Sequence, residues 1–468
     1  MRYFGPIMLK ISIIPFMVLL IFLKPAFTKD IITLDLKRAV LLAERSDTVL
    51  KALQFNRKVF MAQSETAKRA FYPKITSELK RTQVVTFSNP RGATILTFDN
   101  SLEIPIYDRA LVYKKRKAKS ELLLNRFQIE NRLNNLTKEI YTLYYSILNL
   151  KALMRVRKQE YGKAKQSYGL TKKKLKHKRI LPLDLLLNEG LMRQTRNDWI
   201  KAQHDYKEEK LNLLQKLDIK NDIRLTKDNT LFRGIRSRQE SLKIAMSQRG
   251  ELKEIEMQKK VRQEAYEIER SILYPKISLF SDLMVTGVNS YQFKDRTDWS
   301  IFVTLSLALI DDVTLTPRAG VFQDFRLPNP KDEQSISLSI FDGSSNRNLR
   351  ARTEGDYKNI RYEIKDLKAK IRREILSAYH DLIEAKNTLL LARLNLKIGK
   401  GLVKKAKVEL RLGRKGLEEV IVAREKNIRF RVEFRQAILN YQLAVLNLKW
   451  ATGILWSEQF SPENIFFK

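Results

Sequence analysis

The sequence predicts a mainly α-helical chain with a smaller β-sheet portion, organised as two copies of one unit. Three observations support this fold class. The tetrapeptide YPKI occurs at 72–75 and again at 274–277, within surroundings that also repeat. Two very long segments, 108–178 and 346–413, carry apolar residues at helical spacing. Shorter segments between them alternate apolar and polar residues, which is typical of strands.

The first residues are expected to lie outside the fold. Arg2 and Lys10 precede the apolar run ISIIPFMVLLIFL, and small residues follow it near Thr28. This layout is that of an export signal, and the run is too short for a membrane helix of ~18 or more apolar residues. We therefore predict a signal peptide over 1–28 and an exported chain.

Composition excludes several classes of function. The chain has 89 Lys and Arg against 52 Asp and Glu, a net charge of +37, and no Cys. This charge permits binding to anionic partners, but an export signal argues against nucleic acid. Without Cys there are no disulfides or thiolate metal sites, and His177, His204 and His380 are too widely spaced for a metal. No nucleophile–base set or phosphate loop is present, so we expect neither enzymatic activity nor a cofactor.

The repeat extends in both directions from YPKI. Upstream, Leu50 pairs with Leu252 at the YPKI offset of 202 residues; downstream, IPIYD (104–108) pairs with LSIFD (338–342) at 234. DYKEEKLNL (205–213) matches NYQLAVLNL (440–448) at 235. The offset jumps only once, so the second copy carries an insertion. We assign the first copy to 29–232, the second to 233–456 and a tail to 457–468.

Each copy is expected to contain the same elements in the same order. A helical stretch, over 33–71 or 235–272, ends at the Tyr-Pro pair because a residue before Pro disfavours the helical conformation. A β region follows, at 74–107 and within 276–341. A long helix comes next, and after a tight turn a second helix closes the copy. The closing helices are predicted over 182–218 and 417–452.

The long helices determine the shape. From Ile360 to Leu410, apolar or small residues recur about every 3.57 positions, between the coiled-coil and straight-helix values. At ~1.5 Å per residue, each long helix spans roughly 100 Å. A globular core cannot enclose such rods, so they must line up in a bundle or around a cylinder.

Each predicted strand has one apolar and one polar face. In 94–108, Leu96 and Phe98 alternate with Thr97 and Asp99, and 301–309 and 335–341 alternate likewise. This pattern suits either a half-buried sheet in water or a barrel wall between lipid and water. One chain offers about four strands, or six if 313–334 adds a hairpin and not an external loop. A membrane barrel needs at least ~8 strands and no open edge, so several chains would have to share it.

With these elements in order, the mature chain resembles the outer-membrane efflux proteins of the TolC type. The resemblance is carried by FRQAILNYQLAVLNLKWATGIL (434–455), by the Tyr-Pro pairs at 72–73 and 274–275, and by the turns IPIYD and IFDG. It implies a homotrimer with a shared β-barrel in the outer membrane, continued by an α-helical tunnel through the periplasm. It also implies a passive exit duct for a tripartite efflux or type I secretion system. The implied partners are a periplasmic adaptor and an inner-membrane transporter.

The resemblance places a periplasmic tip at the turns KHKRILPLDLL (176–186) and RLGRKGLEEVI (411–421). Family members carry Gly in each turn, followed by a carboxylate in the next helix. The second turn fits this pattern, whereas the first has Lys in place of Gly and keeps the acid. The residues implied in adaptor docking and gating are Lys178, Arg179, Leu181, Pro182, Asp184, Gly413, Arg414, Gly416, Leu417 and Glu419.

Local explanations remain open for these tip residues. An acid in the first turn of a helix complements the helix dipole, as do the cations of Lys172–Lys176 at a helix end. The functional alternatives are a gate of acidic side chains and a basic mouth that attracts anionic cargo or an acidic adaptor.

A second reading of the whole chain is a secreted, basic, helical rod that scaffolds a surface layer or binds anionic polymers. It accounts for the helices and the charge but leaves the strands unexplained. Partition into the outer membrane as heat-labile trimers would favour the channel, and a fully helical soluble product would favour the rod.

Overall fold

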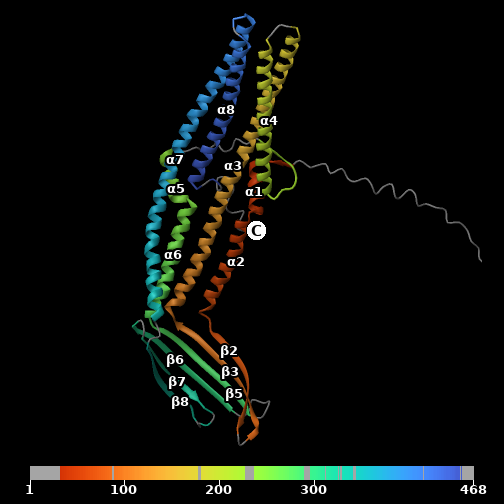
Figure 1. Cartoon of the computed structure of the whole chain (residues 1–468). Helices are drawn as coiled ribbons and strands as arrows, with labels where there is room; N and C mark the ends of the chain where they lie inside the picture. Colours follow the sequence, from red (N-terminus) through yellow and green to blue (C-terminus); the bar gives the residue numbers. More distant parts are fainter. Residues whose placement is uncertain are drawn as a thin grey trace, which may run out of the picture.

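The computed structural model describes residues 32–86, 89–177, 181–226, 237–288, 296–310, 313–324, 326, 329–340, 344–414, 416–453 and 455. A bundle of long helices stands on one end of a curved antiparallel sheet, which gives an elongated molecule (Figure 1). The expected signal peptide and the tail at 457–468 lie outside the described residues. None of the described helices combines the length and apolar character needed to cross a membrane.

Two helical hairpins form the larger part of the bundle. In the first, α3 (Arg109–Lys176) is followed by α4 (Pro182–Lys216). In the second, α7 (Ser344–Arg411) is followed by α8 (Leu417–Ala451). The long helices have 68 residues each and their partners 35 each, so each long helix extends about 100 Å. Both hairpins turn at the end of the molecule that lies opposite the sheet (Figure 1).

Four shorter helices line the half of the bundle nearer the sheet, and each predicted single helix proves to be two. Over 33–71 the structure has α1 (Leu36–Ser46) and α2 (Thr48–Arg69). Over 235–272 it has α5 (Arg238–Gln248), α6 (Gly250–Arg270) and the 3-10 turn η2 (Ser271–Leu273).

One extended residue causes each break. Asp47 has ψ 117°, and its carboxylate accepts a hydrogen bond from the Leu50 N–H at 2.7 Å, which caps α2. Arg249, at the corresponding place 202 residues later, has ψ 125°. A single extended residue barely disturbs the apolar period, so the sequence pattern did not reveal the breaks.

A small parallel sheet was also missed. β1 (Ile32–Leu34) occupies the expected start of the first helix and pairs with β4 (Ile223–Leu225). The hydroxyl of Tyr144 lies 2.7 Å from the Thr226 carbonyl and 3.0 Å from that of Leu34, and so ties α3 to both strands. Three-residue strands that pair across the chain leave too little pattern to be predicted.

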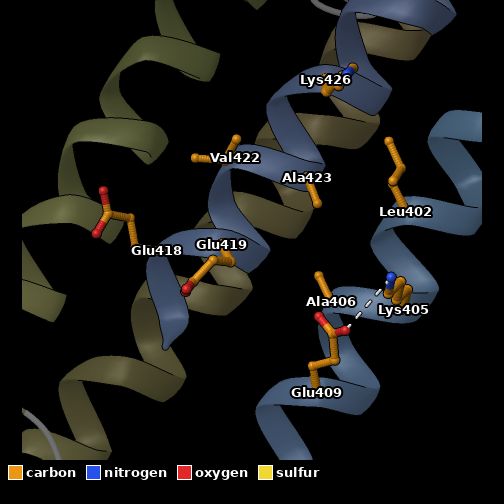
Figure 2. A pocket seen from close by; sticks show the side chains of 9 residues that line it. All are labelled: Leu402, Lys405, Ala406, Glu409, Glu418, Glu419, Val422, Ala423 and Lys426. Carbon is orange, nitrogen blue, oxygen red and sulfur yellow. Dashed lines mark ion pairs between the residues drawn. The ribbon is translucent and has the colours of Figure 1, made fainter. Parts of the chain in front are cut away.

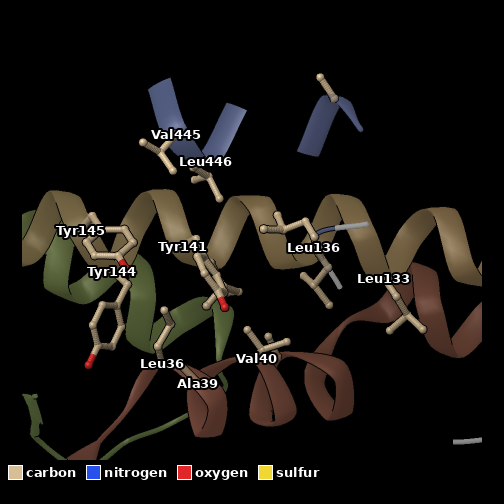
Figure 3. Close-up of a cluster of buried hydrophobic side chains, with 14 of the residues drawn as sticks. Leu36, Ala39, Val40, Leu133, Leu136, Tyr141, Tyr144, Tyr145, Val445 and Leu446 are labelled. Carbon is tan, nitrogen blue, oxygen red and sulfur yellow. The ribbon is translucent and has the colours of Figure 1, made fainter. Parts of the chain in front are cut away.

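The main core surrounds the middle of α3 (Figure 3). Tyr141, Tyr144 and Tyr145 are fully buried there, and neighbouring rings meet edge to face at about 6 Å between centroids. Helix α1 covers one side of this stretch and α8 the other. The packing fixes the relation between the two hairpins at mid-height.

The larger sheet has six strands in the order β2-β3-β5-β6-β7-β8, all antiparallel. Their bounds are β2 (Lys74–Thr86), β3 (Asn89–Tyr107), β5 (Lys276–Val288), β6 (Arg296–Ile310), β7 (Val313–Gln323) and β8 (Lys331–Ile340). The segment between β6 and α7 therefore adds a hairpin, β7–β8, and the six strands of the larger sheet equal the upper of the two numbers expected.

Candidate functional site in the sheet and the helical tip

One face of the six-stranded sheet is mainly apolar, although Ser77, Asn100 and Ser281 interrupt it and Asp332 and Gln334 of β8 lie on it. Residues paired across antiparallel strands share a face, so the register assigns each side chain. In the single chain many of these side chains are exposed, Ile75 at 72% and Ile336 at 74%. A large exposed apolar surface of this kind marks contact with lipid or protein. Its members include Ile75, Leu79, Phe98, Leu102, Ile104, Ile277, Leu279, Ile301, Val303, Leu305, Leu315, Val321, Ile336, Leu338 and Ile340.

The opposite face is mainly polar over the same six strands, although Phe280, Met284, Phe302 and Phe322 also lie on it. It carries Thr76, Glu78, Asp99, Ser101, Glu103, Ser278, Asp282, Ser300, Thr304, Thr316, Arg318, Ser335, Ser337 and Ser339. The sheet is thus a wall with one mainly apolar and one mainly polar surface, and the added hairpin follows this alternation from Val313 to Val321 and from Ser335 to Ile340.

Strand β7 packs closely against β6. Gly320 lies opposite Phe302, and a Cβ on Gly320 would collide with the carbonyl oxygen of Ile301. The guanidinium of Arg318 lies 3.5 Å from the ring centroid of Phe302, which is buried. These contacts join the hairpin to the sheet.

The second Tyr-Pro junction lies where helices meet the sheet. The Arg109 guanidinium at the start of α3 lies 3.8 Å from the ring centroid of Tyr274 and 3.2 Å from the carboxylate of Glu267. The junction thereby holds the beginning of α3 beside the end of α6, next to the first residues of β5.

At the first turn of the tip, Asp184 acts as a helix cap. The Leu181 N–H donates to its carboxylate at 3.3 Å, and Pro182 occupies the first turn of α4. This capping bond gives the acid a local role beside the dipole interaction that the sequence left open. Lys178 and Arg179 lie outside the described residues.

At the second turn, Gly413 ends α7 in a Schellman motif. Its φ is +70°, its N–H donates to the Leu410 carbonyl at 3.2 Å, and the Arg414 N–H donates to the Glu409 carbonyl at 3.0 Å. The left-handed conformation explains the glycine. Gly416 then precedes α8, whose first residue is Leu417.

The two helices leave a groove of about 540 Å³ beside this turn. Glu418 and Glu419, in the first turn of α8, line it together with Lys405 and Glu409 of α7, which lie 3.9 Å apart (Figure 2). The predicted residue Glu419 is therefore exposed at the tip, in a groove that holds more carboxylates than amines.

The two hairpins meet just inside the tip, in what we call the inter-hairpin contact. Arg431 of α8 pairs with Glu160 of α3 and donates to the Gln159 side chain at 3.0 Å. Arg424 donates to Ser167 at 3.1 Å, and Ser167 donates to the buried Asn188 at 3.0 Å. Ala164, Leu191 and Ile421 form a small buried cluster beside these bonds.

Sequence reasoning missed the inter-hairpin contact. The available signal was weak: Arg424 and Arg431 are seven residues apart and so share one face of α8. Their partners are more than 250 positions away in the sequence, and no periodicity identifies them.

The outermost surface of the tip is both apolar and basic. Leu181, Leu183 and Leu186 of the first turn and Leu412 of the second are exposed. Lys173, Lys174 and Lys176 end α3, and Arg411 ends α7. Exposed leucines rimmed by charge are typical of a protein–protein contact.

Among the described residues, no three His, Asp or Glu side chains gather as they would around a metal ion.

Neither a protein-family model nor a curated protein matches the sequence. Solved structures do match its fold. A membrane protein from Pseudomonas aeruginosa has a TM-score of 0.71 at 14% identity, over 89% of this chain and 90% of the other. The Campylobacter jejuni CmeC outer membrane channel has a TM-score of 0.69 at 14% identity, over 89% and 85%. The open state of the Neisseria gonorrhoeae MtrE outer membrane channel has 0.68 at 11% identity, over 89% and 88%.

The chain therefore has the fold of the TolC-type outer-membrane channels, which confirms the resemblance predicted from the sequence. It shares this fold over most of the length of both chains in each comparison.

Proposed function

We propose that the chain is a subunit of an outer-membrane channel that conducts substrates passively out of the periplasm. The observation that supports this most strongly is the two-faced sheet with unpaired edges. An apolar face suits lipid and a polar face suits a water-filled lumen. A six-stranded sheet cannot close around a lumen alone, and an open edge is not tolerated in lipid. The function therefore requires several copies, and the shared fold favours three.

The long helices would continue the conduit through the periplasm. At about 100 Å they are far longer than a membrane needs and are solvated along much of their circumference, which suits the wall of a tunnel. The equal helix lengths of the two hairpins support a repeat of two units, 29–232 and 233–456, placed side by side around one axis.

The tip is proposed to dock onto a periplasmic adaptor, which links the duct to an inner-membrane transporter of a tripartite efflux or type I secretion system. Exposed Leu181, Leu183 and Leu412 support a protein partner at this end. The proposed docking and gate residues remain those named from the sequence, and Arg424 and Arg431 are added to them. Export by a cleaved signal peptide at 1–28 belongs to the same proposal.

Opening of the tunnel would separate the two hairpins at the tip. Each hairpin is held internally by a long helix–helix contact, whereas among the residues that the structure describes the hairpins meet near the tip through the inter-hairpin contact and its small apolar cluster. Among the described residues at that end, this contact therefore holds the helices together least strongly, and we expect it to break first when the hairpins move apart.

Fractionation and electrophoresis test the proposed function. The full-length protein should pellet with outer membranes, resist extraction by salt, and migrate as a trimer that heating converts to monomers. Recovery as a soluble periplasmic protein would support the secreted rod instead. The rod fits the helices and the charge, but a broad exposed apolar face would be a liability in water.

A further inference from the structure

We propose that all six strands of each chain form the barrel wall, and that β8 of one chain pairs with β2 of the next. A trimer would then enclose a barrel of eighteen strands. This inference rests on the proposed function and adds the identity of the seam between subunits and the width of the pore.

The β7–β8 hairpin has the character of wall and not of loop. β7 pairs with β6 from Trp299–Gln323 down to Ile310–Val313, and β8 pairs with β7 from Lys331–Phe322 to Ile340–Val313. β7 and the part of β8 nearer the helices (335–340) continue the apolar and polar faces of the other four strands, whereas Asp332 and Gln334 put polar side chains on the apolar side of the outer part of β8. A loop outside the membrane would need neither full-length pairing nor an apolar face.

The addition moves the edge of the sheet. Without the hairpin, the edges would be β2 and β6; with it, β6 is paired on both sides and the edges are β2 and β8. β2 leads away from the helices and β8 leads back to them, so these two edges run antiparallel when copies stand side by side. They have 13 and 10 residues and are exposed throughout the part of their length that the structure describes.

The stagger of the sheet matches that of a closed barrel over six strands. One row of paired residues runs from Lys74 through Glu103, Phe280, Phe302 and Gly320 to Glu333. Lys74 is the helix end of β2, whereas Glu333 lies seven residues from the helix end of β8. Both helix ends of these strands lie within five residues of a bundle helix, α2 for β2 and α7 for β8.

The seven-residue stagger gives the angle at which the strands tilt from the barrel axis. Seven residues at ~3.3 Å rise about 23 Å, while five strand spacings of ~4.8 Å cover about 24 Å, which gives a tilt of about 44°. Barrel strands tilt by ~35–45°, so the six strands already have the shear that closure requires. If the hairpin folded away from the wall, its register would be under no such constraint.

The number of strands determines the width of the pore. With ~4.8 Å between strands and a tilt of ~40°, an eighteen-stranded barrel is about 36 Å across between backbones, against about 24 Å for twelve strands. The interior face of the extra hairpin adds Arg318 and three serines to the lumen wall.

Disulfide trapping tests the seam, and the chain contains no native Cys that would interfere. Ser337→Cys on the lumen face of β8 is combined in turn with Thr76→Cys, Glu78→Cys or Lys80→Cys on that of β2. Outer membranes are oxidised and resolved without reductant. We expect covalent dimers and trimers from at least one combination, and none from the single variants. Thr304→Cys on β6, with the same three partners, is the matched control and should not cross-link.

Cross-links from Thr304→Cys and not from Ser337→Cys would overturn the proposal, since β6 would then be the seam. Heat-labile trimers that cross-link from neither position would overturn it as well. If the unmodified protein forms no membrane trimer, the proposed function itself fails, and the seam with it. Electron cryomicroscopy of the trimer gives a direct count: eighteen strands are expected, and twelve would refute the inference.

Discussion

Replacing Arg431 by Gln should loosen the closed tip. Arg431 joins α8 to α3 through Glu160, whose side chain is only 7% exposed, while that of Arg431 is 21% exposed. Arg431→Gln removes the positive charge and keeps much of the side-chain volume. Glu160 is then left as a nearly buried carboxylate beside Lys163, which stays at 3.1 Å.

The magnitude follows from burial. Removing one partner of a fully buried ion pair costs about 3–5 kcal/mol. Arg431 is partly exposed and Lys163 still compensates the charge of Glu160, so we expect the closed tip to be destabilised by about 1–2 kcal/mol per chain. If the contact breaks on opening, this energy shifts the balance toward the open state. Since 1.4 kcal/mol is a factor of ten, three chains of a trimer together give a shift of about a hundredfold or more.

Single-channel recording in planar lipid bilayers measures the effect. The purified Arg431→Gln protein should spend a much larger fraction of time in its high-conductance state than the unmodified protein. Arg429→Gln is the matched control, because Arg429 is exposed on the same helix and the substitution changes the net charge equally. The double variant with Glu160→Gln should show less than the sum of the two single effects.

Equal opening by Arg431→Gln and Arg429→Gln would refute the reasoning, because the effect would then come from net charge. Unchanged closure in both would show that the inter-hairpin contact does not hold the tip.

Three further predictions concern other parts of the chain. Gly413→Ala places a Cβ at φ +70°, so it should lower the free energy of unfolding by about 1 kcal/mol and speed amide exchange at the tip. Gly401→Ala, which has open space around it within α7, should instead raise the free energy of unfolding by up to ~1 kcal/mol. Burial raises the pKa of Asp47, but the Arg132 guanidinium and the Leu50 N–H outweigh burial and hold the pKa below its usual value. The ionised Asp47 carboxylate therefore stabilises the fold at neutral pH, and this stabilisation is lost as the pH falls below about 4. Asp47→Asn should flatten that part of the profile of melting temperature against pH, and an unchanged slope would contradict the assignment. Tyr144→Phe removes the hydroxyl between α3 and the parallel strands and should lower the free energy of unfolding by about 1–2 kcal/mol in a thermal melt, whereas exposed Tyr362→Phe should have no measurable effect.

Long periodic elements could be predicted from the sequence because their signal accumulates over many residues. The apolar spacing from Ile360 to Leu410 indicated α7, and the alternation around Leu96 and Phe98 indicated β3. The breaks at Asp47 and Arg249 escaped notice because one extended residue shifts the helical phase only slightly. For β7, the sequence around Pro317 and Gly320 was compatible with a loop as well as with a strand.

In the candidate site, too, some residues could be predicted from the sequence and others could not. Gly413 could be identified from the sequence because a left-handed helix end favours glycine, and Asp184 because it begins a helix. The pairing of Arg431 with Glu160 could not, because it depends on how two hairpins far apart in the sequence pack together. The register of the β7–β8 hairpin likewise became evident only from the pairing of whole strands.

The most direct test of the channel is conductance by the purified full-length protein. Trimers extracted from outer membranes and added to a planar lipid bilayer should produce discrete current steps, and heating them to monomers beforehand should abolish the steps. A protein that reaches the periplasm as a soluble monomer and produces no current steps would contradict the account.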